Sequence, residues 1–324
     1  MHVRGRIEDW TKVHARMART AEPHAQGDIG RNPCYLGHCP ASVIEGNTMS
    51  ENQPIADAAL IREACDGVVT LRMNRPLQLN ALSEAAICAF QLEIDALARD
   101  SDVRCVVIAS TGKAFCAGHD LLEMRRNWRL SYYQALFARC SRLMQSIQSL
   151  PVPVIARVQG IATAAGCQLV GSCDLAIASD TARFAVSGIN VGLFCATPSV
   201  ALSRNVSPKR AFDMLVTGRF IDAATAVEWG LINAAVPVND LDAAIAHKTR
   251  EIARKSPAAI RYGKSMFYRQ RQMELSEAYA LASDVMARNM MEYDACEGID
   301  AFLSKREPIW SSGGPRRTNV DSAT

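Results

Sequence analysis

The chain has 324 residues, of which 49% are hydrophobic, 21% charged and 6% aromatic. That composition is typical of a globular protein with a sizeable core in one or two domains. The formal net charge of +3 is too small to indicate nucleic-acid binding. No stretch reaches the ~18 uninterrupted apolar residues that a membrane span needs. We therefore expect neither a nucleic-acid partner nor a membrane partner.

The eleven cysteines are spread over the chain, several of them in apolar strings such as those around Cys105 and Cys167. This pattern is typical of reduced, buried thiols and not of a disulfide framework. It predicts a cytoplasmic protein, or one of the mitochondrial matrix in a eukaryote. Cys34 and Cys39 flank His38, but no second ligand pair follows at zinc-finger spacing, so no metal site is expected.

The first 55 residues differ from the rest of the chain. They hold four of the six histidines, are broken by Gly, Pro and Asn, and lack a sustained periodicity. Their acidic residues argue against a transit peptide, and no apolar core of a secretory signal is present. We expect 1–55 to be a disordered extension, with Met49 as an alternative translation start.

From about residue 65 the pattern becomes regular. Residues 67–74 predict a strand, and a turn-rich connection leads to a helix over 83–100 with Ser83 as its N-cap. The β-branched run at 103–110 predicts a strand that is buried on both faces.

The same cycle then repeats. A helix over 131–150 is stopped by two prolines, and the strand 154–160 leads into a loop and a helix within 160–174. Strands are also expected at 174–180 and 182–186. Strands that alternate with helices predict an α/β fold with mostly parallel pairing.

After residue 207 the chain is interpreted as helical, over 207–218, 222–230, 241–255 and 256–291. These segments predict a helical C-terminal portion, followed by a polar tail at 311–324.

Several segments, in order and at ordinary spacing, resemble the enoyl-CoA hydratase/isomerase (crotonase) superfamily. They are NRPLQLNAL (74–82), GKAFCAGHDL (112–121), the stretch from PVPVIARVQG to ARFAV (151–186), LVTGRFIDAATAVEWGLINAAVP (215–237) and EGIDAFLSKREPIW (297–310). The resemblance implies a ClpP/crotonase-like spiral of ββα units over 60–250. It also implies a helical trimerisation region at 251–310. The implied partners are an acyl-CoA thioester and further copies of the chain, as a homotrimer or a dimer of trimers.

The chemistry that the resemblance implies passes through a thioester enolate. Negative charge develops on the thioester oxygen, and two backbone N–H groups stabilise it. At the matching positions, those donors are the amides of His119 and Ala165. Ala165 stands where the family usually has glycine, which a backbone donor tolerates if its φ is negative. Coenzyme A belongs to the substrate, and no separate cofactor is implied.

The resemblance also implies a coenzyme A site. It places the adenine and the pantetheine arm along 74–82 and the turn at 113–117, and it places further contacts near the C-terminus. The implied contact residues are Leu79, Ala81, Lys113, Ala114, Cys116, Ala117, Phe302 and Lys305. Arg75 and Lys113 are candidates to meet phosphates. Phe302, Lys305 and Arg306 are candidates to reach coenzyme A, including that of a neighbouring subunit.

Two positions depart from the family pattern. Hydration of a 2-enoyl-CoA needs one carboxylate to activate water and another to deliver a proton. The first position holds Gln168, whose amide cannot accept the proton of a water at neutral pH. The second falls at Gly188. We therefore expect ordinary hydratase activity to be absent, although Gln168 retains the ability to hold a water.

Three functions remain open from the sequence. The first is an acyl-CoA-processing enzyme of the hydratase/isomerase group in fatty-acid metabolism. The second is a decarboxylase of a malonyl-type acyl-CoA, in which His119 supplies more than its backbone N–H. The third is an acyl-CoA-binding pseudoenzyme. Asp120, Asp174 and Cys167 are interpreted as structural, and Glu123 is expected to face solvent or the coenzyme A entrance.

Overall fold

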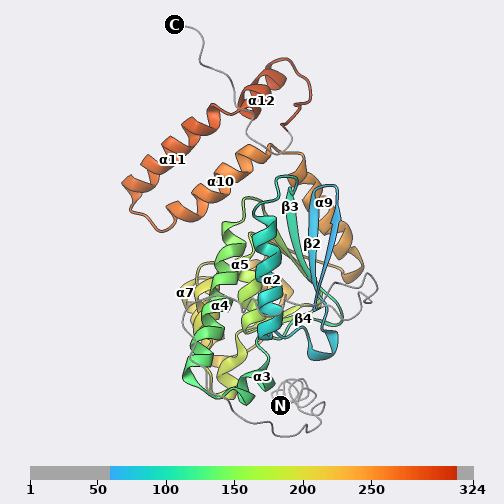
Figure 1. Cartoon of the computed structure of the whole chain (residues 1–324), viewed down its shortest axis with the longest axis vertical. Coiled ribbons are helices and arrows are strands. Elements are labelled where there is room, and N and C mark those ends of the chain that lie inside the picture. Colours follow the sequence, from blue (N-terminus) through green and yellow to red (C-terminus); the bar gives the residue numbers. More distant parts are fainter. Residues whose placement is uncertain (1–58, 312–324) are drawn as a thin grey trace, which may run out of the picture.

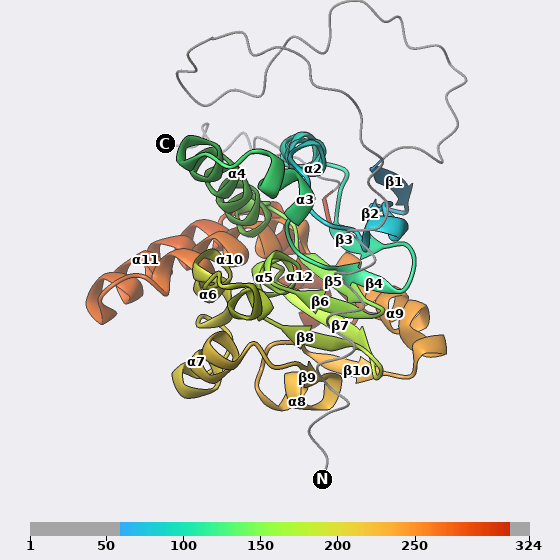
Figure 2. The same cartoon turned by 90° about the horizontal axis from the view of Figure 1, so that it is seen from below.

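The computed structural model describes residues 59–311. The predicted extension at 1–55 lies outside the described residues, as does the predicted tail apart from Ser311. Two sheets form the centre of the molecule (Figures 1 and 2). The larger has the strand order β1-β2-β3-β5-β7-β10 and the smaller the order β4-β6-β8-β9.

The strands of the larger sheet are β1 (Leu60–Cys65), β2 (Val68–Met73), β3 (Cys105–Ser110), β5 (Val154–Val158), β7 (Leu175–Ser179) and β10 (Ala234–Val236). Those of the smaller sheet are β4 (Ala114–Cys116), β6 (Ile161–Thr163), β8 (Arg183–Ala185) and β9 (Ile221–Asp222). Strands β2, β3, β5, β7 and β10 run parallel, and so do β4, β6 and β8. Only β1 and β9, at the ends, pair antiparallel.

Strands β3, β5 and β7 are each followed by a short strand of the second sheet and then by a helix. The helices of this part are α2 (Glu84–Leu97), α3 (Leu121–Arg126), α4 (Leu130–Ser149), α5 (Ala165–Ser172), α6 (Ala196–Leu202), α7 (Pro208–Thr217) and α8 (Ala223–Glu228). Thus β3–β4 leads to α3 and α4, β5–β6 leads to α5, and β7–β8 leads to α6. This repeat is the predicted spiral of ββα units, and the α/β fold class is confirmed.

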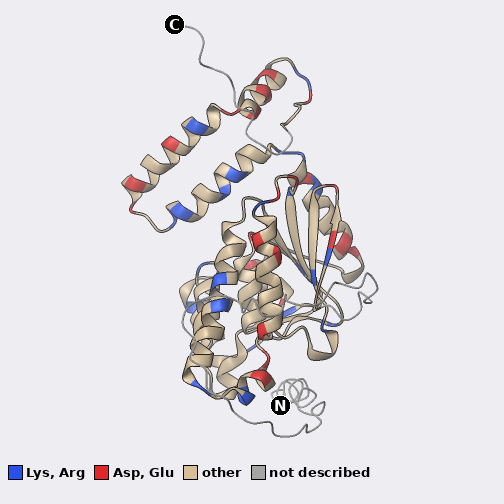
Figure 3. Ribbon diagram, in the orientation of Figure 1, with Lys and Arg blue, Asp and Glu red and all other residues tan. Residues whose placement is uncertain are grey.

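The strand β3 explains how the core is divided. Val106 and Ile108 pack into the main apolar cluster beneath α2, α4 and α5. Cys105 and Val107 pack on the other face, against α9 (Leu241–Ala253). Because helices cover both faces, the strand carries no charged residue, whereas the edge hairpin of β1 and β2 carries charges, as do helices and loops (Figure 3). The prediction of a strand buried on both faces is confirmed.

The C-terminal helices are α10 (Pro257–Gln270), α11 (Leu275–Met290) and α12 (Tyr293–Leu303). They project from one end of the molecule (Figure 1). The expected boundary between 250 and 251 falls inside α9, which continues to Ala253. Three short 3-10 helices complete the described part, at Pro76–Gln78, Ser187–Val191 and Val238–Asp240.

Two elements differ from the sequence expectations. Strand β1 was not predicted, because its residues are charged and largely exposed on the sheet edge. Its signal was the Asp66–Gly67 dipeptide, which turns the hairpin with positive φ at both residues, 50° and 75°. The interpretation of everything after residue 207 as helical was wrong for β9 and β10, whose two and three residues are too short to show a period.

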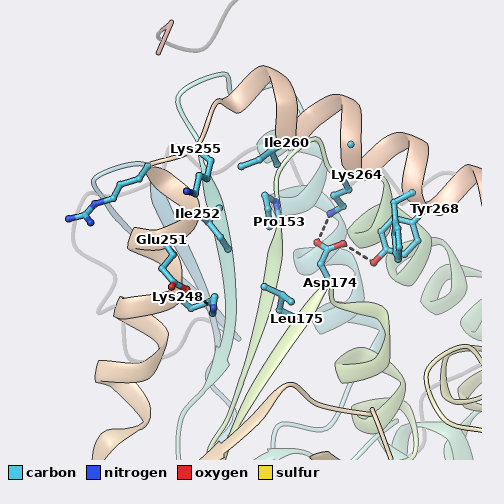
Figure 4. Close-up of a pocket in the computed structure, with 13 residues that line it drawn as sticks. Pro153, Asp174, Leu175, Lys248, Glu251, Ile252, Lys255, Ile260, Lys264 and Tyr268 are labelled. Atoms are coloured by element: carbon cyan, nitrogen blue, oxygen red, sulfur yellow. Dashed lines mark hydrogen bonds and ion pairs between the residues drawn. The ribbon is translucent and has the colours of Figure 1, made fainter. Parts of the chain in front are cut away.

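A buried ion pair joins α10 to the sheet. Lys264 donates to Asp174 over 2.6 Å and also to the carbonyls of Ile147 and Val152. The Tyr268 hydroxyl donates to the same carboxylate over 2.8 Å, as Figure 4 shows. The Lys264 and Asp174 side chains are 7% and 14% exposed, so the pair is held in a largely dehydrated position.

We expect Asp174→Ala to lower the free energy of unfolding by about 3–5 kcal/mol, because it leaves the buried Lys264 ammonium without its counter-charge. Urea denaturation of the full chain measures the change. Asp284→Ala is the matched control, since its ion pair with Arg288 is exposed and should contribute about 0.5 kcal/mol or less. Equal losses in the two variants would contradict the role assigned to Asp174.

Candidate active site

A cavity of about 150 Å³ lies where the start of α5 meets the turn after β4. The segment 187–198 closes it on the other side, and α3 and α4 contribute one wall. Its lining is mostly apolar: Ala117, His119, Leu121, Met124, Phe137, Ala164, Ala165, Ser187, Gly188, Val191, Leu193, Phe194, Cys195, Ala196, Thr197 and Pro198. The polar groups among them are one imidazole, two hydroxyls and one thiol. An apolar pocket with a few polar groups is the usual form of a small-molecule site.

The peptide N–H and C=O groups of His119 are directed away from the neighbouring segment at Leu82. Leu82 donates to the carbonyl of Gly118 over 2.7 Å and accepts from the amide of Asp120 over 3.2 Å. These two bonds flank His119 without using its own peptide groups. Successive residues of an extended segment direct those groups to alternate sides, so the amide of His119 is directed away from Leu82. It has no acceptor among the described residues.

The amide of Ala165 is also without a described acceptor. Ala165 is the first residue of α5, and the first N–H groups of a helix have no partner within it. Gly118 and Gly166 allow this helix end to approach the turn after β4. A Cβ on Gly118 would lie 3.2 Å from the Ala165 nitrogen, and one on Gly166 would lie 2.1 Å from the carbonyl oxygen of Cys116. The structure therefore places the two predicted donor amides on adjoining turns at one cavity.

Backbone strain sits one residue before the helix. Ala164 has φ 51° and ψ −120°, in the half of the map that favours glycine. Ala165 itself is not among the residues with positive φ, so the condition set for its replacement of glycine is met. Such strain costs on the order of 1–3 kcal/mol and persists only where the surrounding structure imposes it.

Among the described residues, no carboxylate lines the cavity, and Gln168 is not part of the lining either. Gln168 is 5% exposed, and its side-chain oxygen is buried without a hydrogen-bond partner in the described part of the chain. Gly188 does line the cavity, and its amide donates to the Cys195 sulfur over 3.2 Å. A Cβ at 188 would lie 2.5 Å from the Leu193 carbonyl oxygen and 2.8 Å from that sulfur. The position therefore lacks both a carboxylate and the room for one.

The His119 ring is enclosed by the cavity wall. It meets Phe137 edge-on, with ring centroids 5.4 Å apart. Both ring nitrogens are buried without a hydrogen-bond partner among the described residues. Burial lowers the pKa of His119 from 6.5 to about 4, so the imidazole is neutral at pH 7. A neutral imidazole offers one hydrogen-bond donor and one acceptor.

The residues implied for coenzyme A fall into two groups. Leu79, Ala114 and Ala117 form one small buried cluster, and Ala117 donates its amide to the Leu79 carbonyl. Ala81 and Cys116 are buried beside them, and Lys113 is exposed. Phe302 on α12 and Lys305 just after it lie at the other end of the molecule (Figure 1). Within one chain, the structure does not bring these two groups together.

Two residues hold the conformation of the loop 74–82, and neither was assigned that role from the sequence. Asn80 is 2% exposed, and its side-chain amide donates to the carbonyls of Thr111 and Ala114. Arg75 donates to the Ala81 carbonyl over 3.1 Å and pairs with Asp120 at 3.5 Å, so its guanidinium serves the loop itself. Buried loop asparagines of this kind have no sequence signal besides the turn pattern.

The predictions for the remaining acids and thiols are mostly confirmed. Asp120 caps α3, and Asp174 holds α10, so both are structural. Cys167 is a core residue, and burial raises the pKa of its thiol to about 12. The expectation for Glu123 was wrong, because its carboxylate accepts the amide of Glu84 at the start of α2. Arg306 is paired with Glu297 through both guanidinium nitrogens.

A search of the described residues finds no group of three or more His, Cys, Asp or Glu that could hold a metal ion. The Cys34–Cys39 segment lies outside the described residues. No described helix is long and apolar enough to cross a membrane.

Residues 63–313 match the sequence profile of the family described as enoyl-CoA hydratase/isomerase. The chain belongs to this family. It is 44% identical over 245 residues to mitochondrial enoyl-CoA hydratase domain-containing protein 3 of Xenopus laevis, covering 76% of this chain and 83% of that protein. This family member is also similar to the solved structure of an enoyl-CoA hydratase from Mycobacterium smegmatis. That match has 55% identity and a TM-score of 0.78, over 78% of this chain and 99% of the other.

The solved structure of human enoyl-CoA hydratase domain-containing protein 3 is also similar. It is 42% identical, with a TM-score of 0.76, and the match covers 78% of this chain and 100% of that one. These comparisons agree with the resemblance seen in the sequence segments. The profile match at 63–313 extends from the edge hairpin to beyond α12, and thus includes the cavity.

We expect Ala164→Gly to leave the protein equally stable or to stabilise it by about 1 kcal/mol, because glycine relieves the strain at positive φ. Thermal unfolding measures the change. Ala86→Gly, inside α2, is the matched control and should destabilise by about 1 kcal/mol. A similar loss at both positions would contradict the strained conformation of Ala164.

We expect the stability of this protein to fall between pH 6.5 and pH 4 in part because of His119. The pKa of His119 is lowered in the folded state, so the unfolded chain binds the proton first as the pH falls. This proton binding stabilises the unfolded state relative to the folded state. Relative to His119→Leu, the wild type should lose up to about 3 kcal/mol over this window. Urea denaturation at several pH values measures it, with His247→Leu on the exposed face of α9 as control. Parallel profiles for the wild type and His119→Leu would contradict the burial of a neutral imidazole.

Proposed function

We propose that this protein binds acyl-CoA thioesters and stabilises negative charge on the thioester oxygen with the amides of His119 and Ala165. The observation that carries the proposal is that two amides without described acceptors adjoin the same apolar cavity. The Ala165 amide is also at the positive end of the α5 dipole, which favours an anion. Two such donors form an oxyanion hole, and loss of one typically costs about 3 kcal/mol of transition-state stabilisation.

The cavity takes the acyl group. Its walls are made by Leu121, Met124, Phe137, Leu193 and Phe194, and its volume of about 150 Å³ is that of a site that accepts a benzene-sized apolar group. Coenzyme A then extends along the cluster of Leu79, Ala114 and Ala117, with exposed Lys113 available to a phosphate. Lys305 and Phe302 contribute only from a neighbouring subunit, because their own chain holds them at the far end.

The reaction does not follow the usual hydratase scheme. Activation of a water needs a base, and neither Gln168 nor Gly188 supplies one. The chemistry that this site supports is formation and stabilisation of an enolate, with the neutral His119 ring as a hydrogen-bonding group in the cavity and Gln168 buried behind the cavity lining. The assignment to the hydratase/isomerase group thus concerns the thioester and the oxyanion hole, and not the addition of water.

A second candidate function is decarboxylation of a malonyl-type acyl-CoA. The bond between the α-carbon and the carboxylate breaks, its electron pair enters the enolate, and carbon dioxide leaves. The enolate then takes a proton at the α-carbon. The observation that favours this reaction is the cavity lining, in which no cationic side chain of the described residues stabilises the substrate carboxylate. The neutral His119 ring can hydrogen-bond a water, and this water delivers the proton to the α-carbon. A non-catalytic acyl-CoA-binding protein is the third candidate.

The proposed setting is fatty-acid metabolism in the cytoplasm or, in a eukaryote, the mitochondrial matrix. The cysteines of the described residues form no disulfide with one another, which supports a reducing compartment. The proposed assembly is a homotrimer or a dimer of trimers. Exposed apolar residues on α11 and α12, including Leu275, Met286 and Phe302, support contacts between subunits through the C-terminal helices.

We expect Ala165→Pro to weaken acyl-CoA binding or turnover by about 100-fold, because it removes one donor. Proline is tolerated at the first helical position, so the fold should be retained. Ala165 is 1% exposed and belongs to the core, and a bulky residue there would disturb packing as well as the cavity. Isothermal titration with a non-reactive acyl-CoA and kinetic assays measure the effect. Ala165→Gly keeps the N–H and serves as control. Unchanged binding and turnover in a folded Ala165→Pro protein would contradict the oxyanion hole.

We expect no hydration of crotonyl-CoA in a mass-spectrometric turnover screen, since the cavity lacks a general base. The same screen should include a long-chain enoyl-CoA, methylmalonyl-CoA and ethylmalonyl-CoA, with His119→Ala in parallel. Loss of carbon dioxide that depends on His119 would support the decarboxylase candidate. Binding without turnover would support the non-catalytic one, and hydration would contradict the argument from Gln168 and Gly188.

A further inference from the structure

The connection between α3 and α4 carries an exposed group of apolar and cationic side chains. Residues 125–130 read RRNWRL and contain no acidic residue. Trp128 is 71% exposed and Leu130 is 74% exposed. The three arginines beside them, Arg125, Arg126 and Arg129, are also exposed. A tryptophan and a leucine so exposed within six residues are unusual on a surface without a partner.

The charge of the segment 125–130 is not neutralised by its neighbours. None of its three guanidinium groups makes an ion pair with a described residue. The two nearest acids in sequence have other roles, because Asp120 caps α3 and Glu123 accepts the Glu84 amide. The surface therefore presents three positive charges together with two apolar side chains.

The Trp128 ring contacts one residue of α3 and one of α4. The Arg125 guanidinium lies over it, 5.1 Å from the ring centroid, and Tyr133 meets it edge-on at 5.9 Å. Tyr133 stacks on Phe137 at 6.3 Å and donates its hydroxyl to the Met124 carbonyl. Because Met124 and Phe137 line the cavity, the exposed indole is separated from it by one layer of side chains.

The segment lies at the end of the molecule opposite the projecting helices α10–α12, where Figure 3 shows basic residues at the α3–α4 connection. A surface docked there would not contact the C-terminal helices. The two sets of exposed apolar residues are therefore separate features of the chain.

We propose that the segment 125–130 docks on the surface of an anionic lipid bilayer. Arginines bind lipid phosphates, at about 1 kcal/mol each near an anionic membrane surface. Tryptophan has its preferred position at the boundary between headgroups and acyl chains, where Leu130 would also be buried. A soluble anion accounts for the arginines but not for the exposed Trp128 and Leu130, whereas a lipid surface accounts for both. A contact of this kind needs no spanning helix, and it does not depend on the proposed reaction.

Co-sedimentation of the full chain with vesicles tests the proposal. We expect binding to phosphatidylcholine vesicles that contain phosphatidylglycerol, weaker binding as salt is raised, and little binding to phosphatidylcholine alone. The triple variant Arg125→Gln, Arg126→Gln, Arg129→Gln should lose on the order of 100-fold in affinity. The control triple Arg99→Gln, Lys209→Gln, Arg250→Gln removes the same charge from other exposed positions and should lose much less.

The apolar part is tested separately. Trp128→Ser with Leu130→Ser should weaken binding at least about tenfold, because it removes the side chains that enter the interface. On vesicle binding, tryptophan emission should shift to the blue in the wild type and not in Trp128→Phe. Equal loss in the two charge triples would overturn the proposal, since it would show attraction by net charge. Binding that survives the double serine change, or that is equal on both kinds of vesicle, would also overturn it.

Discussion

The close approach of the α5 start to the turn after β4 is the constraint on which the site depends. It requires the absence of side chains at Gly118 and Gly166, whose Cβ atoms would meet backbone nitrogen and oxygen at 3.2 Å and 2.1 Å. The two ββα units that meet here are joined through the parallel pairing of β4 with β6. Sheet topology thus brings two peptide groups from distant parts of the sequence to one cavity. The helix must begin abruptly for this geometry, which is the physical reason for the strained Ala164.

The two positions at which the family pattern has carboxylates, Gln168 and Gly188, differ in their structural surroundings. At Gln168 the exchange of acid for amide keeps a side chain of the same size in the same buried place, so only the chemistry differs. At Gly188 the backbone of Leu193 and the sulfur of Cys195 occupy the space that a side chain would need. The segment 187–198 therefore fills the space beside Gly188. The expectation that ordinary hydratase activity is lacking thus rests on the side chain at position 168 and on the backbone path at position 188.

The sequence was most informative where local rules decide the structure. The Ser83 cap, the doubly buried β3 and the alternation of strands with helices followed from residue type and period, whereas the spiral of ββα units followed from the family resemblance. The positions of Gln168 and Gly188 followed from the family resemblance. Long-range contacts could not be read in this way: the enclosed His119 ring, the Glu123 carboxylate on the α2 start and the closed loop at Gly188 depend on segments tens of residues apart. Strands β9 and β10 were missed because their two and three residues carry too little pattern.

The attachment of α5 has a mechanical consequence. This helix of eight residues is buried along its whole length and spans roughly 12 Å. Its first residue meets the turn after β4, and Asp174, just beyond its last, is bound to Lys264 and Tyr268 of α10. With both ends attached, α5 cannot shift without moving either the cavity or the projecting helices. Its amides should therefore exchange hydrogen only through opening of the whole domain. A partner that binds α10 would thus act on the Ala165 amide at the cavity through a helix attached at both ends.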